Sequence, residues 1–346
     1  MKHYRPVRDK ETLDALSTVS KWKSPLLIFA IYLLVILLIA ANVLVSSPVL
    51  FTISFIVIAG LQSHLLILLH EGAHTNLHPN TKVNKLLSNI FCAYPFATQS
   101  KIYASLHLAH HRYSGNSKND PEVKFYALQG HLHQGLSRSK LIVTLLQDIL
   151  GWSALRTSLF AFSTFQKMVE DKKARPLTAL EVTGQLLTIA TIVLISYLTG
   201  TLFYLLTLWV LPYITLCMFF IKVHGYGEHN GQLGGREIDR TYTHEYSALA
   251  NFFYYPIKSG YHFEHHCYPN IPWYNVEKLR AIYKNDKEHQ KQVEATTLDG
   301  IFFGKKTIIN QVLRPQVQTE KSVRELDGIH IDNDADSSIE EQLKNT

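Results

Sequence analysis

Four long apolar runs, arranged in two pairs, dominate the pattern of apolar and polar positions along this chain. Pro25 to Val45 is almost continuously apolar, and its 21 residues would span about 31 Å as a helix, the thickness of one bilayer core. Leu50 to Leu69 follows after only four residues, Ser-Ser-Pro-Val, so we expect a tight helical hairpin. The third and fourth runs, about Leu180–Leu198 and Leu202–Ile221, are separated by Thr-Gly-Thr. The pattern predicts four transmembrane helices in two hairpins.

Two further apolar segments lie between the hairpins, at Asn84–Ala97 and Leu141–Trp152, and both are too short to cross a bilayer. We expect them to form interfacial or buried helices against the membrane. The chain after residue 314 turns polar and acidic, which is typical of a disordered or loosely packed tail. The predicted fold class is therefore an all-α integral membrane protein whose two hairpins carry a cytosolic helical cap.

The predicted organisation has three parts: a cytosolic N-terminal segment over 1–24, a membrane domain over 25–314 and the acidic tail over 315–346. A composition of 47% apolar and 18% charged residues agrees with a membrane protein. No secretory signal is visible at the N-terminus, and the three scattered cysteines suggest no disulfide framework.

The formal net charge of +6 is distributed unevenly. The two hairpin connections, around Ser46–Pro48 and Thr199–Thr201, contain no Lys or Arg, whereas the N-terminus, residues 75–178 and the chain after 221 hold nearly all of them. By the positive-inside rule these three regions, and both termini, are cytosolic. We expect a multi-pass protein of a bacterial inner membrane rather than the endoplasmic reticulum. No aromatic-basic motif suggests a nucleic-acid partner.

Candidate chemistry comes from three histidine clusters beside the apolar runs. They hold eight of the 18 histidines, in the sequences His70-Glu-Gly-Ala-His74, His107-Leu-Ala-His110-His111 and His262-Phe-Glu-His265-His266. Imidazole can stay uncharged near neutral pH and ligate a transition metal. Eight such ligands are too many for one ion and about right for two.

Helical spacing places the clustered histidines on common faces. His70 and His74 are four residues apart, so on a helix they project from one face, at the cytosolic end of the second span. The other two clusters repeat the spacing with one flanking histidine each. Three helices that converge below the membrane could therefore enclose two metal ions.

The order HxxxH, HxxHH, HxxHH, interleaved with two membrane hairpins, resembles the membrane fatty acid desaturase family and its relatives the carotenoid ketolases, sphingolipid desaturases and lipid hydroxylases. HEGAHTNLHPNTKVNKLLSNIF is similar to the first histidine box of that family and the helix after it. HLAHHRYSGNSKNDPE resembles the second box with its trailing acidic motif, and GYHFEHHCYPNIPWYNVEKL resembles the third. The resemblance covers roughly residues 25–285.

The resemblance implies a non-haem di-iron centre, with irons cycling between Fe2+ and Fe3+, that uses O2 as co-substrate. The implied ligands are His70, His74, His107, His110, His111, His262, His265 and His266. Members of the family usually add a ligand after the fourth span, where His229 matches better and His224 is the second choice. Carboxylates usually accept the outer N–H of ligating imidazoles. Asp120 and Glu228 are the leading candidates, ahead of Glu71 and Glu264.

The implied activity is that of an oxidoreductase acting on paired donors: a lipid desaturase that introduces a carbon–carbon double bond into a fatty acyl chain and reduces O2 to water. The alternative within the superfamily is a lipid or carotenoid hydroxylase or ketolase. The chain contains neither a GxGxxG nucleotide fingerprint nor the HPGG motif of fused cytochrome domains. Electrons are therefore expected from an external ferredoxin-type or cytochrome-type donor. Acyl length, bond position, head group and oligomeric state stay open.

Two interpretations from other classes compete with this one. His70-Glu-Gly-Ala-His74 also fits the HExxH helix of zinc proteases, and Leu298-Asp299-Gly300 resembles an acidic motif of intramembrane proteases. That interpretation leaves six clustered histidines without a role. A metal transporter would need ligands inside the spans rather than at their ends. His64, the histidine within the second span, is expected to be a hydrogen-bonded residue and not a ligand.

Overall fold

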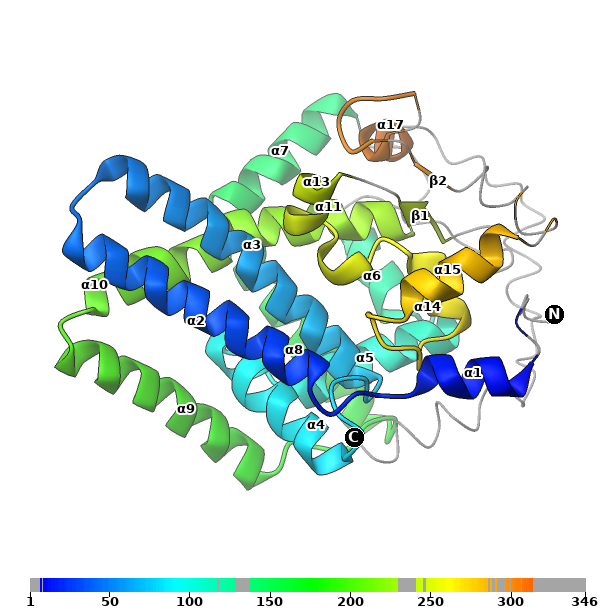
Figure 1. The fold of residues 1–346 in the computed structure, drawn as a ribbon, viewed down its shortest axis with the longest axis horizontal. Coiled ribbons are helices and arrows are strands. Elements are labelled where there is room, and N and C mark those ends of the chain that lie inside the picture. The colour runs from blue at the N-terminus through cyan, green and yellow to red at the C-terminus, as the bar shows by residue number, and fades with distance from the viewer. Residues whose placement is uncertain are drawn as a thin grey trace.

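Helices make up almost all of the fold in this computed structural model (Figure 1). The structure describes residues 7, 9–116, 118–128, 137–229, 241–244, 247–285, 287, 290, 297–298, 300–305 and 307–313. The acidic tail predicted for 315–346 lies outside the described residues. The four helices long and apolar enough to cross a membrane match the four predicted spans, and the all-α fold class is confirmed.

The first hairpin consists of α2 (Lys23–Leu44) and α3 (Pro48–Ala73). The turn between them is short because Ser47 caps α3 at once: its hydroxyl accepts the Leu50 N–H, and Pro48 follows at the first helical position. α3 runs four residues further than predicted, from Leu69 to Ala73. The first histidine cluster therefore continues the transmembrane helix itself.

The second hairpin begins with α9 (Ala179–Leu198), which Thr178 and Glu181 start with a reciprocal capping box. Gly200, at φ +69°, turns the chain. The fourth span is a continuous series of α10 (Leu202–Leu205), the π-helical turns η3 (Leu206–Val210) and η4 (Tyr213–Cys217), and α11 (Met218–Glu228). The wide turns flank Pro212, which has no N–H to donate. The helix continues beyond Ile221, where the predicted span ends, to Glu228.

A series of shorter helices joins the hairpins: α4 (Thr81–Leu87), η1 (Ser88–Ala93), η2 (Tyr94–Phe96), α5 (Ser100–Tyr113), α6 (Pro121–Leu128), α7 (Arg138–Ile149) and α8 (Trp152–Glu170). The sequence pattern predicted one apolar segment over 141–152. Gly151, at φ +80°, instead ends one helix and begins the next, since this left-handed conformation cannot continue either.

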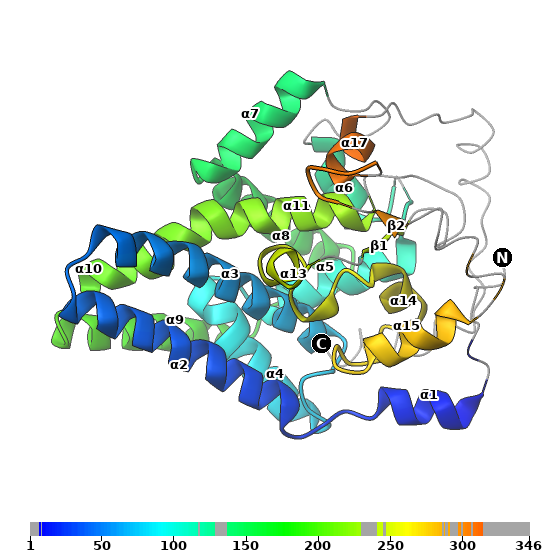
Figure 2. The same ribbon diagram turned by 45° about the horizontal axis from the view of Figure 1, so that its top comes forward.

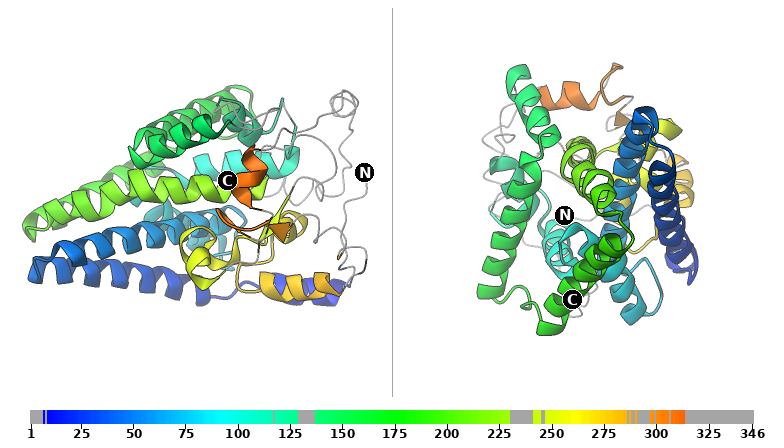
Figure 3. Two further views of the ribbon diagram at one scale, coloured as in Figure 1. Left: turned by 90° about the horizontal axis from the view of Figure 1, so that it is seen from above. Right: turned by 90° about the vertical axis from the view of Figure 1, so that its left-hand side faces the viewer.

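The chain after the fourth span forms small elements around the end of the bundle. They are β1 (Thr243–His244), α13 (Ala248–Phe253), η5 (Pro256–Lys258), α14 (His262–Cys267), α15 (Val276–Lys284), β2 (Thr297–Leu298) and α17 (Ile308–Leu313). β1 and β2 pair in parallel and are the only strands in the described part of the chain. The N-terminal helix α1 (Lys10–Ser17) packs on α15. The long helices extend toward one end of the molecule while these elements gather at the other (Figures 2 and 3).

The main core lies where α2 and α3 meet η1 and η3. Leu65, Leu68 and Leu208 are fully buried there, and Trp209 donates from its indole nitrogen to the carbonyl oxygen of Pro95. The outward faces are apolar and exposed, with Leu44 at 83% and Leu180 at 82%. Exposed leucines on helices of bilayer length are stable only against lipid. The fold is therefore a helical bundle with a packed interior and an apolar outer surface.

A buried ion-pair network ties the second hairpin to the helices that carry the histidines. Glu181, on α9, lies 2.7 Å from the Lys101 Nζ of α5 and 3.0 Å from the Lys85 Nζ of α4. Lys101 is only 6% exposed, so removing its partner would leave an uncompensated buried charge.

We expect Glu181→Ala to destabilise the protein by about 3 kcal/mol, because breaking a buried pair from one side costs several kcal/mol. Thermal denaturation of the detergent-solubilised chain measures the change. Lys173→Ala is the matched control, since its pair with Asp171, at 3.4 Å, is exposed on both sides. Equal melting of the two variants would contradict a structural role for the Glu181 network.

Candidate metal centre

The first histidine cluster lies at the C-terminal end of α3, which is held in place by close packing. His70 is in the last turn of the helix and His74 is its C-cap residue. A side chain at Gly72 would come within 1.9 Å of the Ser88 Oγ, so only glycine allows η1 to approach this closely. Asn84 fixes the same turn by donating to the Gly72 carbonyl oxygen at 2.9 Å.

The second cluster is on α5, where His107 and His111 are one turn apart and His110 flanks them. The third is on the short helix α14, which is held from behind by Glu264. That carboxylate is fully buried and accepts from Arg280 at 2.7 Å and from the Thr243 hydroxyl at 2.8 Å. Glu264 therefore positions α14, because its oxygens bond to Arg280 and Thr243 rather than to an imidazole.

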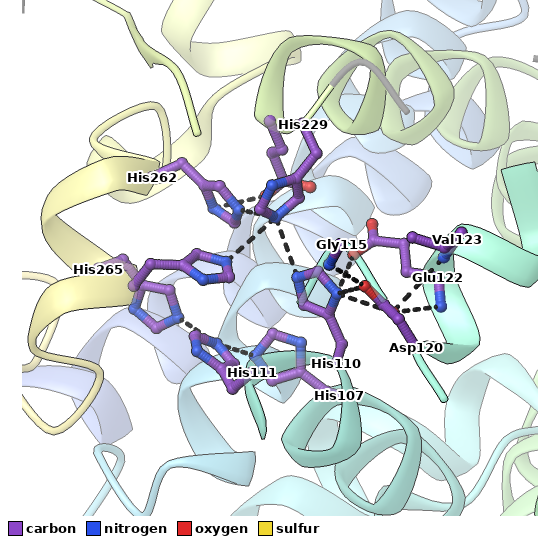
Figure 4. Close-up of polar contacts among 12 residues, drawn as sticks. His107, His110, His111, Gly115, Asp120, Glu122, Val123, His229, His262 and His265 are labelled. Atoms are coloured by element: carbon purple, nitrogen blue, oxygen red, sulfur yellow. Dashed lines mark hydrogen bonds and ion pairs between the residues drawn. The ribbon is translucent and has the colours of Figure 1, made fainter. Parts of the chain in front are cut away.

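These clusters, together with His229 at the end of α11, converge into two groups of ring nitrogens. In each group the candidate ligand atoms all lie within 4.8 Å of one another. The five-histidine group contains His70, His74, His107, His111 and His265, and the four-histidine group contains His110, His229, His262 and His266. The structure thus brings all nine candidate histidines together, and Figure 4 shows how most of them point toward two common centres.

The contacts between these nitrogens are too many for hydrogen bonds alone. The Nε2 atom of His229 lies 2.8 Å from that of His262, 2.9 Å from that of His110 and 3.1 Å from that of His266. One imidazole nitrogen carries either one proton or one lone pair, so it cannot satisfy three partners. Nitrogens about 2.1 Å from a shared metal ion, at right angles, lie about 3 Å apart. The donor set fits a transition-metal ion.

The five-histidine group has the same character. Its Nε2–Nε2 separations are 2.8 Å between His74 and His107, 3.0 Å between His107 and His111, and 3.1 Å between His111 and His265. His70 joins them with its ring centre 4.3 Å from that of His107. Neutral imidazole donors of this number suit iron, copper, zinc or nickel, and they do not suit magnesium or calcium.

Burial keeps most of these imidazoles uncharged. Loss of water around the rings, reinforced by neighbouring histidines, holds the pKa values of His74, His107, His111, His265 and His266 well below the usual range. Burial acts in the same direction on His110, but the Glu122 and Asp120 carboxylates outweigh it and raise the pKa of His110 well above the usual range. The surroundings of His110 therefore favour a positive charge, carried by a proton or by a metal ion.

Carboxylates contact the outer Nδ1 atoms of two histidines. His110 Nδ1 lies 3.0 Å from an Asp120 oxygen and 2.9 Å from Glu122, and His262 Nδ1 lies 3.1 Å from Glu228. Asp120 therefore lies beside the candidate ligand His110 (Figure 4), and Glu228 lies beside the candidate ligand His262. Glu71 makes no such contact, since its oxygen is 3.6 Å from His70 Nδ1 and its other oxygen accepts the Trp273 N–H.

Glu122 was missed as a contact of His110. The signal was present in the acidic motif Asn-Asp-Pro-Glu, in which Asp120 caps α6 by accepting the Glu122 N–H at 2.8 Å. That capping turn brings the Glu122 side chain back to the same imidazole. Sequence spacing alone does not reveal which of two carboxylates in a turn reaches a ring.

The second-choice ligand, His224, lies outside both groups. Its Nδ1 is 2.7 Å from the Tyr254 carbonyl oxygen and its Nε2 is 2.8 Å from Glu228. A carbonyl and a carboxylate both accept, so His224 donates from both nitrogens and has no lone pair for a metal.

Three other histidines bond elsewhere. His64 bonds the Gly60 carbonyl, His78 accepts the Asn80 N–H, and His244 bonds the Gly227 carbonyl. Burial lowers the pKa of His244 to about 3. His3, His131, His133, His289 and His330 lie outside the described residues.

A cleft reaches the two groups from one side. Its lining combines apolar and aromatic side chains, Ile67, Ile257, Ile271 and Trp273 among them, with the candidate ligands His70, His262 and His265 and the charged residues Glu71, Glu228 and Lys258. Histidines from both groups therefore line the same cleft.

Comparison with known proteins agrees with the geometry. Dihydrorhizobitoxine desaturase from Bradyrhizobium elkanii is 33% identical over 82 residues, 23% of each chain. The sphingolipid delta(4)-desaturase/C4-monooxygenase of Bos taurus is 28% identical over 239 residues, 67% of this chain and 66% of that one. The matches thus span less than two thirds of either relative. The sequence profile of the fatty acid desaturase family matches residues 46–294, which include all three histidine clusters and His229. This chain is a member of the fatty acid desaturase family.

Proposed function

We propose that this protein is a membrane-bound, O2-dependent lipid desaturase with two non-haem iron ions, one in each histidine group. The observation that carries the proposal is the convergence of nine imidazoles into two groups at the ends of membrane helices, in a member of the desaturase family. Bound there, iron would supply the activation of O2 and the removal of hydrogen from an unactivated methylene.

The chain's own residues would orient the substrate and keep water from the reacting carbons. The cleft between Ile67, Ile257 and Trp273 is apolar and narrow, so an acyl chain would displace water from it. Asp120, Glu122 and Glu228 would hold the rings of His110 and His262 in one orientation. The product of the reaction would be a double bond between two carbons of the chain, with O2 reduced to water.

Hydroxylation is the second candidate function. The bovine relative carries both a desaturase and a monooxygenase activity in its name. A small displacement of the reacting carbon in the cleft would be enough to change the outcome, since both reactions begin by removing hydrogen. Either reaction needs electrons from outside the chain, so we propose an external ferredoxin-type or cytochrome-type donor at the cytosolic face.

The zinc-protease interpretation has little support. In an HExxH protease the glutamate activates water at the metal. Here Glu71 accepts the Trp273 N–H at 2.9 Å, and its two histidines belong to a group of five. Asp299 of the proposed acidic motif lies outside the described residues.

Expression with a reductase and a donor protein is expected to produce lipids that lack two hydrogen atoms relative to the substrate. Mass spectrometry of cellular lipids detects this change, and a gain of one oxygen atom would indicate the hydroxylase instead. His265→Ala serves as the inactive control, because it removes one candidate ligand that also lines the cleft. An unchanged lipid profile, relative to that control, would contradict both activities.

His229→Ala is expected to lower the iron content of the purified protein from about two ions per chain toward one. The reason is that it removes the imidazole whose Nε2 atom lies closest to the other three histidines of its group. His224→Ala is expected to retain both ions, because neither nitrogen of His224 faces a group. Metal analysis of the two variants measures the difference. Loss of iron from His224→Ala alone would reverse the assignment.

Labelling of single cysteines tests the proposed orientation, with both termini and the histidine groups on the cytosolic side. Cys92, Cys217 and Cys267 are buried, so an introduced surface cysteine would be the one that the labelling reagent reaches. We expect Ser46→Cys, in the first hairpin turn, to react with an impermeant maleimide in intact bacteria. Lys173→Cys should react only after permeabilisation. The opposite pattern would reverse the topology.

A further inference from the structure

We infer that the two histidine groups are unequal metal sites: the four-histidine group fills first and holds its ion more tightly than the five-histidine group. This inference rests on the proposed two-metal centre and goes beyond it, because it assigns an order of loading to the two groups. It follows from where the carboxylates lie rather than from the number of imidazoles.

All the short carboxylate contacts belong to the four-histidine group. His110 Nδ1 lies 3.0 and 3.1 Å from the two Asp120 oxygens and 2.9 Å from Glu122, and His262 Nδ1 lies 3.1 Å from Glu228. Asp120 is fully buried and Glu122 is mostly so, which limits screening of their charge by water. Two of the four imidazoles therefore donate to anions held in place.

The five-histidine group has no such partner among the described residues. Its nearest carboxylate is Glu71, 3.6 Å from His70 Nδ1 and outside hydrogen-bond distance. The Nδ1 atoms of His70 and His74 are buried with no hydrogen-bond partner. An ion in this group would be bound by five neutral rings and compensated by no adjacent negative charge.

The difference in negative charge beside the two histidine groups decides which group binds its metal ion first. A carboxylate that accepts the outer N–H makes an imidazole a stronger donor, and each such partner is worth about 10- to 100-fold in metal affinity. The fifth imidazole of the other group adds a ligand but no charge. Glu228 contributes less than Asp120 and Glu122, because His224 donates to it from a doubly protonated ring. Asp120 and Glu122 are therefore the pair to test.

Amide replacements remove these charges with little change of shape. Asp120 accepts the Glu122 N–H on Oδ1 and the Gly115 N–H on Oδ2, both at 2.8 Å. Asparagine keeps the first of these bonds, the capping bond of α6, through its amide oxygen and loses the second. Asp120→Asn with Glu122→Gln therefore keeps the capping turn while it removes two negative charges from His110.

The experiment is an anaerobic titration of the metal-free, full-length protein in detergent with Fe2+ against a competing chelator. The wild type is expected to bind two ions per chain, with dissociation constants at least about tenfold apart. His266→Ala should lose the tight class and His74→Ala should lose the weak class, which assigns each class to its group. The Asp120→Asn/Glu122→Gln variant should weaken the tight class about 10- to 100-fold and leave the weak class unchanged.

Glu71→Gln is the matched control, since it removes a carboxylate beside the other group without a hydrogen bond to its rings, and both affinities should stay as in the wild type. Two ions bound with equal affinity, or loss of the tight class in His74→Ala, would overturn the inference and leave the proposed function standing. Binding of only one ion per chain would overturn the proposed two-iron function as well. The His74→Ala and His266→Ala titrations decide the order even if the double variant does not fold.

Discussion

The structure depends on holding nine imidazoles in two buried groups, in which neighbouring Nε2 atoms lie about 3 Å apart. Buried ring nitrogens whose lone pairs face one another, with too few protons to form hydrogen bonds, destabilise the fold unless a cation binds between them. The rest of the fold must therefore supply stiffness at the ends of four separate helices. Close packing supplies it at Gly72, and buried polar anchors supply it at Asp120 and Glu264. Binding of the proposed metal ions would therefore be coupled to the folding of this end of the molecule.

The membrane helices serve the site by fixing where their ends meet. α3 passes from a lipid-facing hairpin into the first histidine cluster without a break, and the fourth span passes into His229 in the same way. Helices that cross a bilayer have all their backbone hydrogen bonds satisfied within themselves, which makes them rigid supports. The Glu181 network adds α9 to this support by binding it to α4 and α5. A shift of either hairpin would change the distance between the two groups.

Much of this arrangement could be predicted from local patterns. Continuous apolar runs and helical spacing are properties of short segments, and so the four spans and the shared faces of His70 with His74 and His107 with His111 were visible in the sequence. The choice of His229 over His224 came from a resemblance, and the structure gives it a physical reason: both nitrogens of His224 are occupied.

The features that escaped prediction depend on contacts between distant segments. The role of Glu264 is set by Arg280 and Thr243, and the contact of Glu122 is set by a capping turn. Neither has a periodic pattern that could reveal it. The helix break at Gly151 was missed because an apolar run looks the same whether or not one glycine in it adopts a positive φ.

The placement of charge also explains how one site can accept both metal ions and an apolar chain. Asp120 and Glu122 do not line the cleft, whose lining includes His70, His262 and His265. Two other carboxylates do line it, and both have partners: one oxygen of Glu228 contacts His224 and His262, and Glu71 accepts the Trp273 N–H. An acyl chain in the cleft would therefore meet imidazole edges and apolar walls rather than an unpaired anion, which it could desolvate only at a cost of several kcal/mol. The two carboxylates at His110, Asp120 and Glu122, are thus kept out of the cleft, and its apolar surface stays open to the proposed lipid.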